Sequence, residues 1–368
     1  METKKKGFPV AFWVCSCSEI FERLAYYLGR SLILIFVTAS VATGGLGLSD
    51  TVAANMQSNL TAFSYLLPLF GAVIVDKYIG ARYTTPVGMF IAAAGYFTGG
   101  IAKSATGVYV MIFLVSLGLA LFKNGAIIGR VITDKSQMDP AFSMRYTLVN
   151  VGAFIGTFLV GILYKDVFAK DGVLGFAPCF KMAALMMVLG GLWYIFVCWR
   201  FLGDLGKLPF KKTLTEEEKA AEAKKKEEAG TKQPLTTIEK KRIGAIFVAS
   251  LFSIVFWIFW YLGYMPVYFY WAENMDWVVA GYQVPSTWFD AANSLFCVIL
   301  GPVTAALWKK LAARPQGDMS LFRKTGLGIA IIGVGYLFYA AIDIMRGGEK
   351  ASVLWLIVFA FLLTMGEM

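Results

Sequence analysis

Two carboxylates and a guanidinium interrupt the first long apolar stretch of the chain. Glu19, Glu22 and Arg23 lie among residues that otherwise suit a lipid environment. At 100° per residue on a helix, these three fall with Tyr26 and Arg30 within an arc of about 100°, which makes one polar stripe. A charge at membrane depth costs roughly 2.5–3.5 kcal/mol on insertion scales, so such groups persist where they face a protein-lined cavity and serve a function.

Proton transfer is a chemistry that this stripe can support. A buried carboxyl beside a cation can exchange a proton when its surroundings change, and Glu22 lies beside Arg23. The alternative is a static buried ion pair that only holds the helix. The sequence contains no His, so proton chemistry near neutral pH rests on carboxylates. The five Cys residues lie mostly within or beside apolar segments, and we interpret them as reduced packing residues rather than metal ligands.

The composition is that of a membrane protein. Of 368 residues, 58% are hydrophobic and 16% are charged, and the mean hydropathy is +0.64. A soluble chain has about 45–50% apolar and about 25% charged residues. The apolar runs do not alternate as the strands of a β-barrel do, which favours an all-α polytopic protein. The net charge of +10 comes from basic residues in loops between spans, which is typical of membrane topology rather than of nucleic-acid binding.

Ten apolar segments are predicted to span the membrane. They are residues 9–40, 52–75, 83–102, 107–132, 142–164, 179–202, 243–271, 286–310, 322–345 and 351–368. With this arrangement most of the 34 Lys and Arg residues fall on one side, where Arg145 is counted with Arg130 and Lys135. The positive-inside rule then places the N-terminus and the long hydrophilic loop in the cytoplasm.

The spans group into two bundles. Residues 1–202 form a predicted six-helix bundle, 203–242 a charged cytoplasmic linker, and 243–368 a second bundle of four helices. This plan resembles the major facilitator fold, in which two parallel halves surround a site at mid-membrane. Two further helices would complete the second half, so we expect the chain to be truncated after its tenth helix.

Several motifs are similar to those of one family of transporters. The most specific is Glu19-Ile-Phe-Glu22-Arg23 followed by Tyr26-Tyr27, and a second runs from Gly71 to Arg82. The others are Leu121-Phe122-Lys123, Asn150 to Gly156, Val284 to Phe289 with Asn293, and Gly366-Glu367. Together they resemble the proton-dependent oligopeptide transporters, the peptide branch of the major facilitator superfamily.

The resemblance implies a proton-coupled symporter that imports di- and tripeptides by alternating access, with no enzymatic activity and no cofactor besides the proton. It implies proton coupling at Glu19, Glu22 and Arg23. The substrate carboxylate would meet Arg23, Arg30, Lys123 and Asn150, and the substrate ammonium would meet Asn293 and Glu367. Tyr26, Tyr27 and Tyr65 would line the cavity, and Asp76, Lys77 and Arg82 would act in gating.

The sequence departs from the family pattern at three places. Asn124 follows the lysine of the fourth span, where the family usually has Pro. Tyr261 stands where many bacterial members carry an acid, and Asp290 replaces the usual Gln of the eighth span. We expect Asp290 to supply the missing acid as a gating residue that balances Arg30 and Lys123. The alternative is that Asp290 only caps or solvates the start of its helix.

Other interpretations remain for the function and for single residues. The same fold can carry another small anion or zwitterion, such as nitrate or an amino-acid derivative, and a non-transporting receptor or scaffold is a further possibility. Lys123 can be a snorkelling lysine, and Asp76, Lys77 and Arg82 can be cytoplasmic anchors. The predicted location is the bacterial cytoplasmic (inner) membrane, with peptide, protons and lipid as partners.

Overall fold

The computed structural model describes residues 7–134, 137–209, 236–264, 266–317 and 319–368, and these are almost entirely helical. They divide into two compact units. The first comprises residues up to Phe210 together with Trp277–Val298, and the second comprises Lys211–Asp276 and Ile299–Met368. The predicted linker 203–242 is described only at its ends, because residues 210–235 lie outside the described part.

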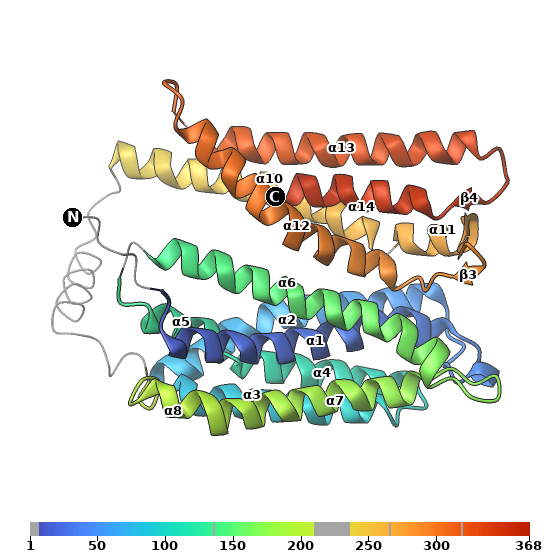
Figure 1. Ribbon diagram of the computed structural model, residues 1–368, viewed down its shortest axis with the longest axis horizontal. Helices are drawn as coiled ribbons and strands as arrows, with labels where there is room; N and C mark the ends of the chain where they lie inside the picture. The colour runs from blue at the N-terminus through green and yellow to red at the C-terminus, as the bar shows by residue number, and fades with distance from the viewer. Residues whose placement is uncertain (1–6, 135–136, 210–235, 265, 318) are drawn as a thin grey trace. The chain divides into compact units, whose positions relative to one another are not determined.

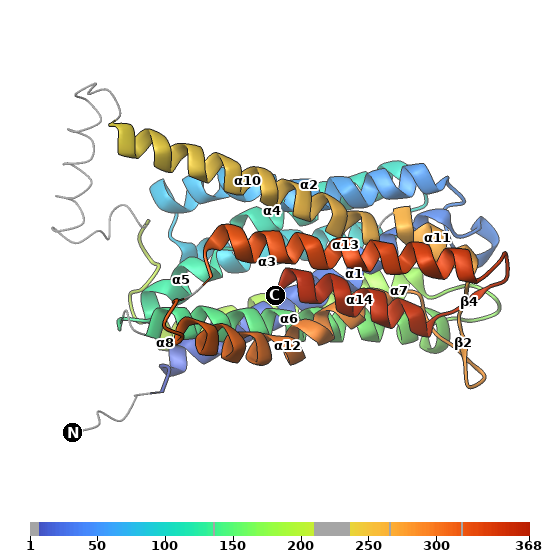
Figure 2. The ribbon, with the colours of Figure 1, turned by 90° about the horizontal axis from the view of Figure 1, so that it is seen from above.

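The helices of the first unit lie side by side along a common direction (Figures 1 and 2). They are α1 (Val10–Thr38), α2 (Asp50–Lys77), α3 (Ala81–Gly99), α4 (Ala105–Leu121), α5 (Asn124–Val131), α6 (Met138–Ile162), α7 (Phe176–Trp193) and α8 (Trp199–Leu202). Helix α1 packs against α6 and α7, while α3 packs against α4 and α7. The side chains of Ser49 and Ser104 cap α2 and α4 by accepting hydrogen bonds from backbone N–H groups.

Two glycines bring α1 and α6 into direct backbone contact. A Cβ atom at Gly152 would lie 2.8 Å from the Ile20 carbonyl oxygen, and one at Gly156 would lie 2.5 Å from the Leu24 carbonyl oxygen. Small residues four apart allow helices to approach closely in this way. This contact of Gly152 and Gly156 with the α1 backbone is the seam between α1 and α6. It holds the middle of α1, where the charges lie, close to α6.

Several predicted spans are interrupted rather than continuous. The fourth breaks between α4 and α5, where Phe122 is extended (φ −74°, ψ 97°). The fifth ends in a π-helical turn, η3 (Leu163–Val167), and the sixth contains another, η4 (Tyr194–Cys198), between α7 and α8. Irregular backbone at membrane depth is tolerated where protein surrounds it, and it is frequent at functional sites.

The second unit contains α10 (Thr237–Gly263), α11 (Pro266–Asn274), α13 (Leu321–Met345) and α14 (Leu354–Glu367). Thr236 and Glu239 form a capping box at the start of α10, so this helix begins earlier than the predicted boundary at 243. Gly328 and Gly366 allow α13 and α14 to approach closely. The short strands β1 (Met275–Asp276) and β4 (Ala351–Ser352) pair in parallel.

Residues 277–298 group with the first unit, although the prediction places them in the second bundle. They form a hairpin of β2 (Val278–Val279) and β3 (Tyr282–Gln283) and the first part of α12 (Trp288–Ala312). The Trp288 ring stacks on Phe158 with 4.6 Å between centroids, and its Nε1 donates to the Phe158 carbonyl at 3.0 Å. Tyr282 donates to Asp166 at 3.1 Å.

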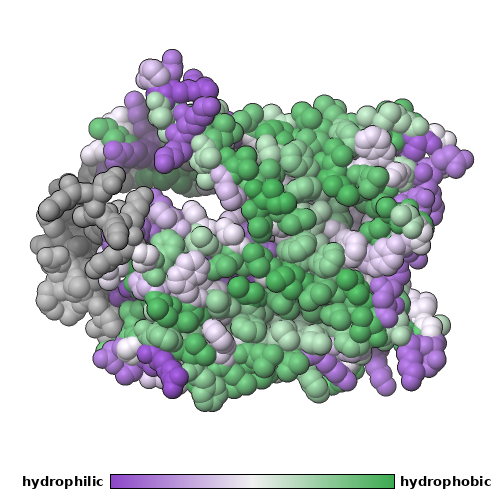
Figure 3. Space-filling model, viewed as in Figure 1, coloured by the Kyte–Doolittle hydropathy of each residue, from purple (hydrophilic) through white to green (hydrophobic). Residues whose placement is uncertain are grey.

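The prediction of an all-α polytopic membrane protein is confirmed. Seven helices of the described chain are long and apolar enough to cross a membrane. Helix α1 is not among them because it carries Glu19, Glu22, Arg23 and Arg30, and α14 is short. On the face seen in Figure 3, apolar residues cover the middle of the helices and hydrophilic residues gather near both helix ends.

Candidate functional site

The two glutamates of α1 are buried within the first unit. Glu19 is 1% exposed and Glu22 is fully buried. The Nε atom of Arg23 lies 2.7 Å from Glu22 Oε2, and the Arg23 guanidinium lies over the Tyr26 ring, 5.5 Å from its centroid. Within the predicted polar stripe, Arg23 therefore contacts both Glu22 and Tyr26.

Glu19 is held from two other helices. Arg145 Nε on α6 lies 2.9 Å from Glu19 Oε1 and 2.8 Å from Oε2. Asn124 Nδ2, at the start of α5, donates to Glu19 Oε1 at 3.1 Å and to the Cys15 carbonyl at 2.8 Å. Gly125 leaves room for the guanidinium, since a Cβ there would lie 3.0 Å from Arg145 Nη2.

Arg145, counted from the sequence among the basic residues of the cytoplasmic side, has a buried partner that the sequence did not predict. The residue lies inside α6, and its side chain contacts the buried carboxylate of Glu19. One signal was present in the sequence. Arg145 precedes Gly152 by seven residues and Gly156 by eleven, which places all three on one helix face. A cation on the face that packs against α1 has the α1 glutamates as its nearest counter-charges.

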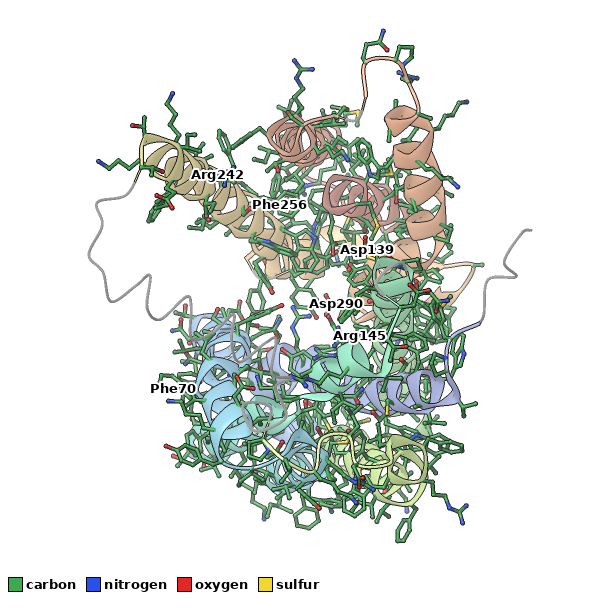
Figure 4. All side chains as sticks on the ribbon, turned by 90° about the vertical axis from the view of Figure 1, so that its left-hand side faces the viewer. Phe70, Asp139, Arg145, Arg242, Phe256 and Asp290 are labelled. Atoms are coloured by element: carbon green, nitrogen blue, oxygen red, sulfur yellow. The ribbon has the colours of Figure 1, made fainter. Side chains whose placement is uncertain are left out.

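Arg30, Ser31 and Asp290 form a second polar group in the first unit. Arg30 is buried, and its guanidinium lies 5.7 Å from the centroid of the Tyr27 ring. Ser31 Oγ donates to Asp290 Oδ2 at 3.3 Å. Asp290 therefore faces α1 beside Arg30, and Asn293, one turn further along α12, is also buried. Figure 4 views the helices nearly end-on with Arg145 and Asp290 labelled.

Lys123 lies at the break between α4 and α5. Its Nζ donates to the Pro68 carbonyl on α2 at 2.8 Å, and the charge of Asp76 acts on the same ammonium. Asn150 on α6 is buried and donates to the Tyr146 carbonyl of its own helix at 3.0 Å. Tyr65 on α2 is 70% exposed in the structure.

The predicted gating residues at the end of α2 and the start of α3 have different surroundings. Arg82 is buried and donates to the carbonyls of Gly203 and Trp199, the second at 3.0 Å. These contacts cap the C-terminal end of α8, a favourable place for a cation. Asp76 is half-buried, and Lys77, the last residue of α2, is exposed.

In the second unit, Glu367 accepts a hydrogen bond from Trp260 Nε1 at 3.2 Å. Trp260 packs against Trp257, Tyr261 and Tyr264, so the position of the missing acid, Tyr261, belongs to an aromatic cluster. All five Cys residues are free thiols. Within the described residues, His, Cys, Asp and Glu side chains form no group of three suited to a metal ion.

Comparisons with known proteins find similarity to one family. The sequence profile of the POT family, PTR2, matches residues 204–368. Over 412 residues that include 98% of this chain and 80% of the relative, the chain is 24% identical to the peptide transporter YePEPT of Yersinia enterocolitica subsp. palearctica serotype O:3 (strain YE-P4). The chain is similar to proteins of the POT family over nearly its whole length.

Solved structures of POT proteins share the fold. A variant of the peptide transporter POT in complex with sulfate superposes with a TM-score of 0.85 at 24% identity, covering 99% of this chain and 81% of that chain. A POT family transporter in complex with 5-aminolevulinic acid gives a TM-score of 0.84 at 23% identity, covering 99% and 83%. The chain therefore shares the fold of these POT structures, and its apolar spans are those of an integral membrane protein.

Proposed function

We propose that this chain is a proton-coupled symporter that imports di- and tripeptides across a bacterial cytoplasmic membrane by alternating access. The observation that carries the proposal is the buried pair of Glu22 and Arg23 on α1, with an Nε–Oε2 distance of 2.7 Å. Loss of hydration favours a neutral carboxylic acid, while a neighbouring cation favours the carboxylate. A conformational change that alters this balance loads a proton on one side of the membrane and releases it on the other.

The charges around α1 suit a substrate with two charged ends. A peptide is a zwitterion, and its carboxylate requires fixed cations, for which we propose Arg23, Arg30 and Lys123 with the amide of Asn150. For the ammonium group we propose the Asn293 amide and the Glu367 carboxylate. The neighbouring Tyr26, Tyr27 and Tyr65 offer ring faces and hydroxyl groups to side chains of different size.

The test of coupling uses the Glu22→Gln variant in liposomes. We expect this variant to lose accumulation of labelled dialanine under an inward proton gradient while retaining part of the exchange of internal for external dialanine, because exchange needs no net proton movement. Asp204→Asn is a matched control, since the Asp204 side chain is 93% exposed. Undiminished accumulation by the Glu22 variant would exclude Glu22 as the carrier of the coupled proton.

The test of substrate recognition compares free and N-acetylated dialanine. Wild type should prefer the free ammonium, and Glu367→Gln should lose that preference, because it no longer offers a carboxylate to the ammonium. Removing one partner of a desolvated charge pair costs roughly 2–5 kcal/mol, so Lys123→Ala should weaken binding at least tenfold. Equal affinity of wild type for the two peptides would exclude the proposed role of Glu367.

A second candidate substrate class is another small zwitterion or anion. Asp290 beside Arg30 and Ser31 changes the charge near the proposed carboxylate site, and one solved relative was crystallised with 5-aminolevulinic acid. Competition of unlabelled 5-aminolevulinic acid or nitrate against dialanine uptake separates the two classes. If 5-aminolevulinic acid or nitrate inhibits the uptake of labelled dialanine at a lower concentration than unlabelled dialanine does, the second candidate is favoured.

A further inference from the structure

The two α1 glutamates, which the family motif treats together, have different surroundings. We propose that Arg145, with Asn124, holds Glu19 as a permanent carboxylate, so that Glu22 alone carries the coupled proton. This inference rests on the proposed function and assigns separate roles within its proton site. Arg145 and Asn124 are positioning residues in this assignment, since they act on substrate and proton only through Glu19.

The contacts of Glu19 are those of a fixed anion. Both of its oxygens lie within 3 Å of Arg145 Nε, and Oε1 also accepts a hydrogen bond from Asn124. Charge-assisted contacts of this kind are about twice as strong as neutral hydrogen bonds. Arginine keeps its proton inside proteins, so its charge is present at every pH at which the protein functions.

The contacts of Glu22 leave its protonation state adjustable. Within the described part of the chain, Arg23 Nε is its ion-pair partner, and neither Glu22 oxygen accepts a hydrogen bond of ordinary geometry. Arg23 is the next residue on the same helix, so a change of its side-chain rotamer can break this contact without a helix moving. Loss of that single contact would leave a fully buried carboxylate, which then favours the neutral acid.

Arg145 cannot turn away so readily, because its position is built into the packing. It projects from the face of α6 whose Gly152 and Gly156 contact the α1 backbone, and its guanidinium occupies the space left by Gly125. Asn124 is the first residue of α5, so Glu19 also lies beside a helix N-terminus, where the helix dipole favours an anion. Two helices, α5 and α6, thus stabilise the same negative charge on α1.

The charged and titratable groups around the two carboxyls are few. Arg23 on α1 and Arg145 on α6 act on both, and Glu19 acts on Glu22. The charge of Glu22 also acts on Tyr96 on α3, whose hydroxyl donates to the Tyr26 carbonyl at 3.3 Å. With both acids ionised, two cations balance two anions. Adding one proton therefore changes the net charge by one unit, and the proposal places that proton on Glu22.

Infrared difference spectroscopy between high and low pH tests this assignment, because a protonated carboxyl has its own C=O stretching band. In reconstituted wild type we expect a band that Glu22→Gln removes and that Glu19→Gln leaves in place. Arg145→Gln should add a second band of similar intensity, because Glu19 loses its fixed cation and takes up a proton. Arg145→Lys, which keeps the charge, should not add the second band.

Two further variants keep the result interpretable. Glu19→Gln/Arg145→Gln removes the acid and its cation together and should abolish the second band, which shows that the band belongs to Glu19. Arg200→Gln changes an exposed arginine and should leave the spectrum as in wild type. In transport assays Arg145→Gln should turn a single-step pH profile of dialanine uptake into two steps.

A wild-type band removed by Glu19→Gln would overturn the inference, and so would an Arg145→Gln spectrum without a second band. Both outcomes come from infrared spectra and need no transport assay, so they can be distinguished from a failure of the proposed function. That failure is instead seen as undiminished gradient-driven accumulation by Glu22→Gln.

Discussion

At the scale of single residues, Asp290 joins two segments that are far apart in the chain. It accepts a hydrogen bond from Ser31 and lies beside Arg30, although 259 residues separate it from Ser31. It is also in the first turn of α12, where an acid is favourable for the helix dipole alone. If Asp290 balances the charge of Arg30, substitutions of the two residues should have non-additive effects on stability. If Asp290 only caps its helix, the effects should be additive.

A double-mutant cycle on Asp290→Asn and Arg30→Gln distinguishes these roles. If the carboxylate balances Arg30, the two changes should be non-additive by about 1–3 kcal/mol in the free energy of unfolding, as is usual for residues in contact. Ser31→Ala should cost less, about 1 kcal/mol, because it removes one hydrogen bond. The measurement is thermal or denaturant unfolding in detergent. Additive effects within about 0.3–0.5 kcal/mol, the usual scatter for independent sites, would leave only the capping role.

The sequence could predict the charges of α1 but not all of their partners. Glu19, Glu22 and Arg23 interrupt an apolar run, and that contrast is visible without a structure. Asn124 and Arg145 become partners of Glu19 only when α5 and α6 pack on α1, more than 100 residues away along the chain. Pairing at such separation depends on which helix faces meet, and composition and periodicity do not specify that.

At the scale of helices, the seam between α1 and α6 sets the geometry of the site. Gly156→Ala places a Cβ atom where the Leu24 carbonyl oxygen lies 2.5 Å away, so the helices must separate. We expect a loss of about 1–3 kcal/mol of stability, the usual effect of overpacking. Gly333→Ala on α13 is the matched control, since a Cβ atom at that position would have no neighbour within 4 Å.

Unfolding of both variants in the same detergent provides the measurement. The control should be unchanged or slightly more stable, because Ala is the better helix former. If Gly156→Ala is as stable as wild type, the close approach of α1 and α6 is not a constraint on the fold.

Helix positions were largely predictable, whereas helix interruptions were not. All ten predicted spans correspond to helices because each is a long apolar run. The break at Phe122 and Lys123 lies inside the apolar run 107–132 without Pro, and the π-turns η3 and η4 lack any sequence signal that we identified. Such features depend on contacts such as that of Lys123 with Pro68, which sequence periodicity does not report.

At the scale of the whole molecule, the distribution of Lys and Arg predicts the orientation in the membrane. Asp204 follows the sixth predicted span on the basic side, and Lys170 lies in the loop on the opposite side; both are exposed. In whole cells, a membrane-impermeant maleimide should label Lys170→Cys and label Asp204→Cys only after permeabilisation. The five native thiols lie in helices, and labelling of the protein without an added Cys gives their background signal. The reverse labelling pattern would invert the proposed topology.

The contact of Glu19 with Arg145 also has a consequence for biosynthesis. Helix α1 leaves the ribosome long before α6. Until α6 has been synthesised, the charges of α1 lack their later partners, and placing each of them in a bilayer costs roughly 2.5–3.5 kcal/mol. We therefore expect α1 to be retained poorly in the membrane until α5 and α6 have been synthesised. A fusion that ends at Ser104 should be extracted from membranes by alkali more readily than one that ends at Val167, and Glu19→Gln should reduce the difference.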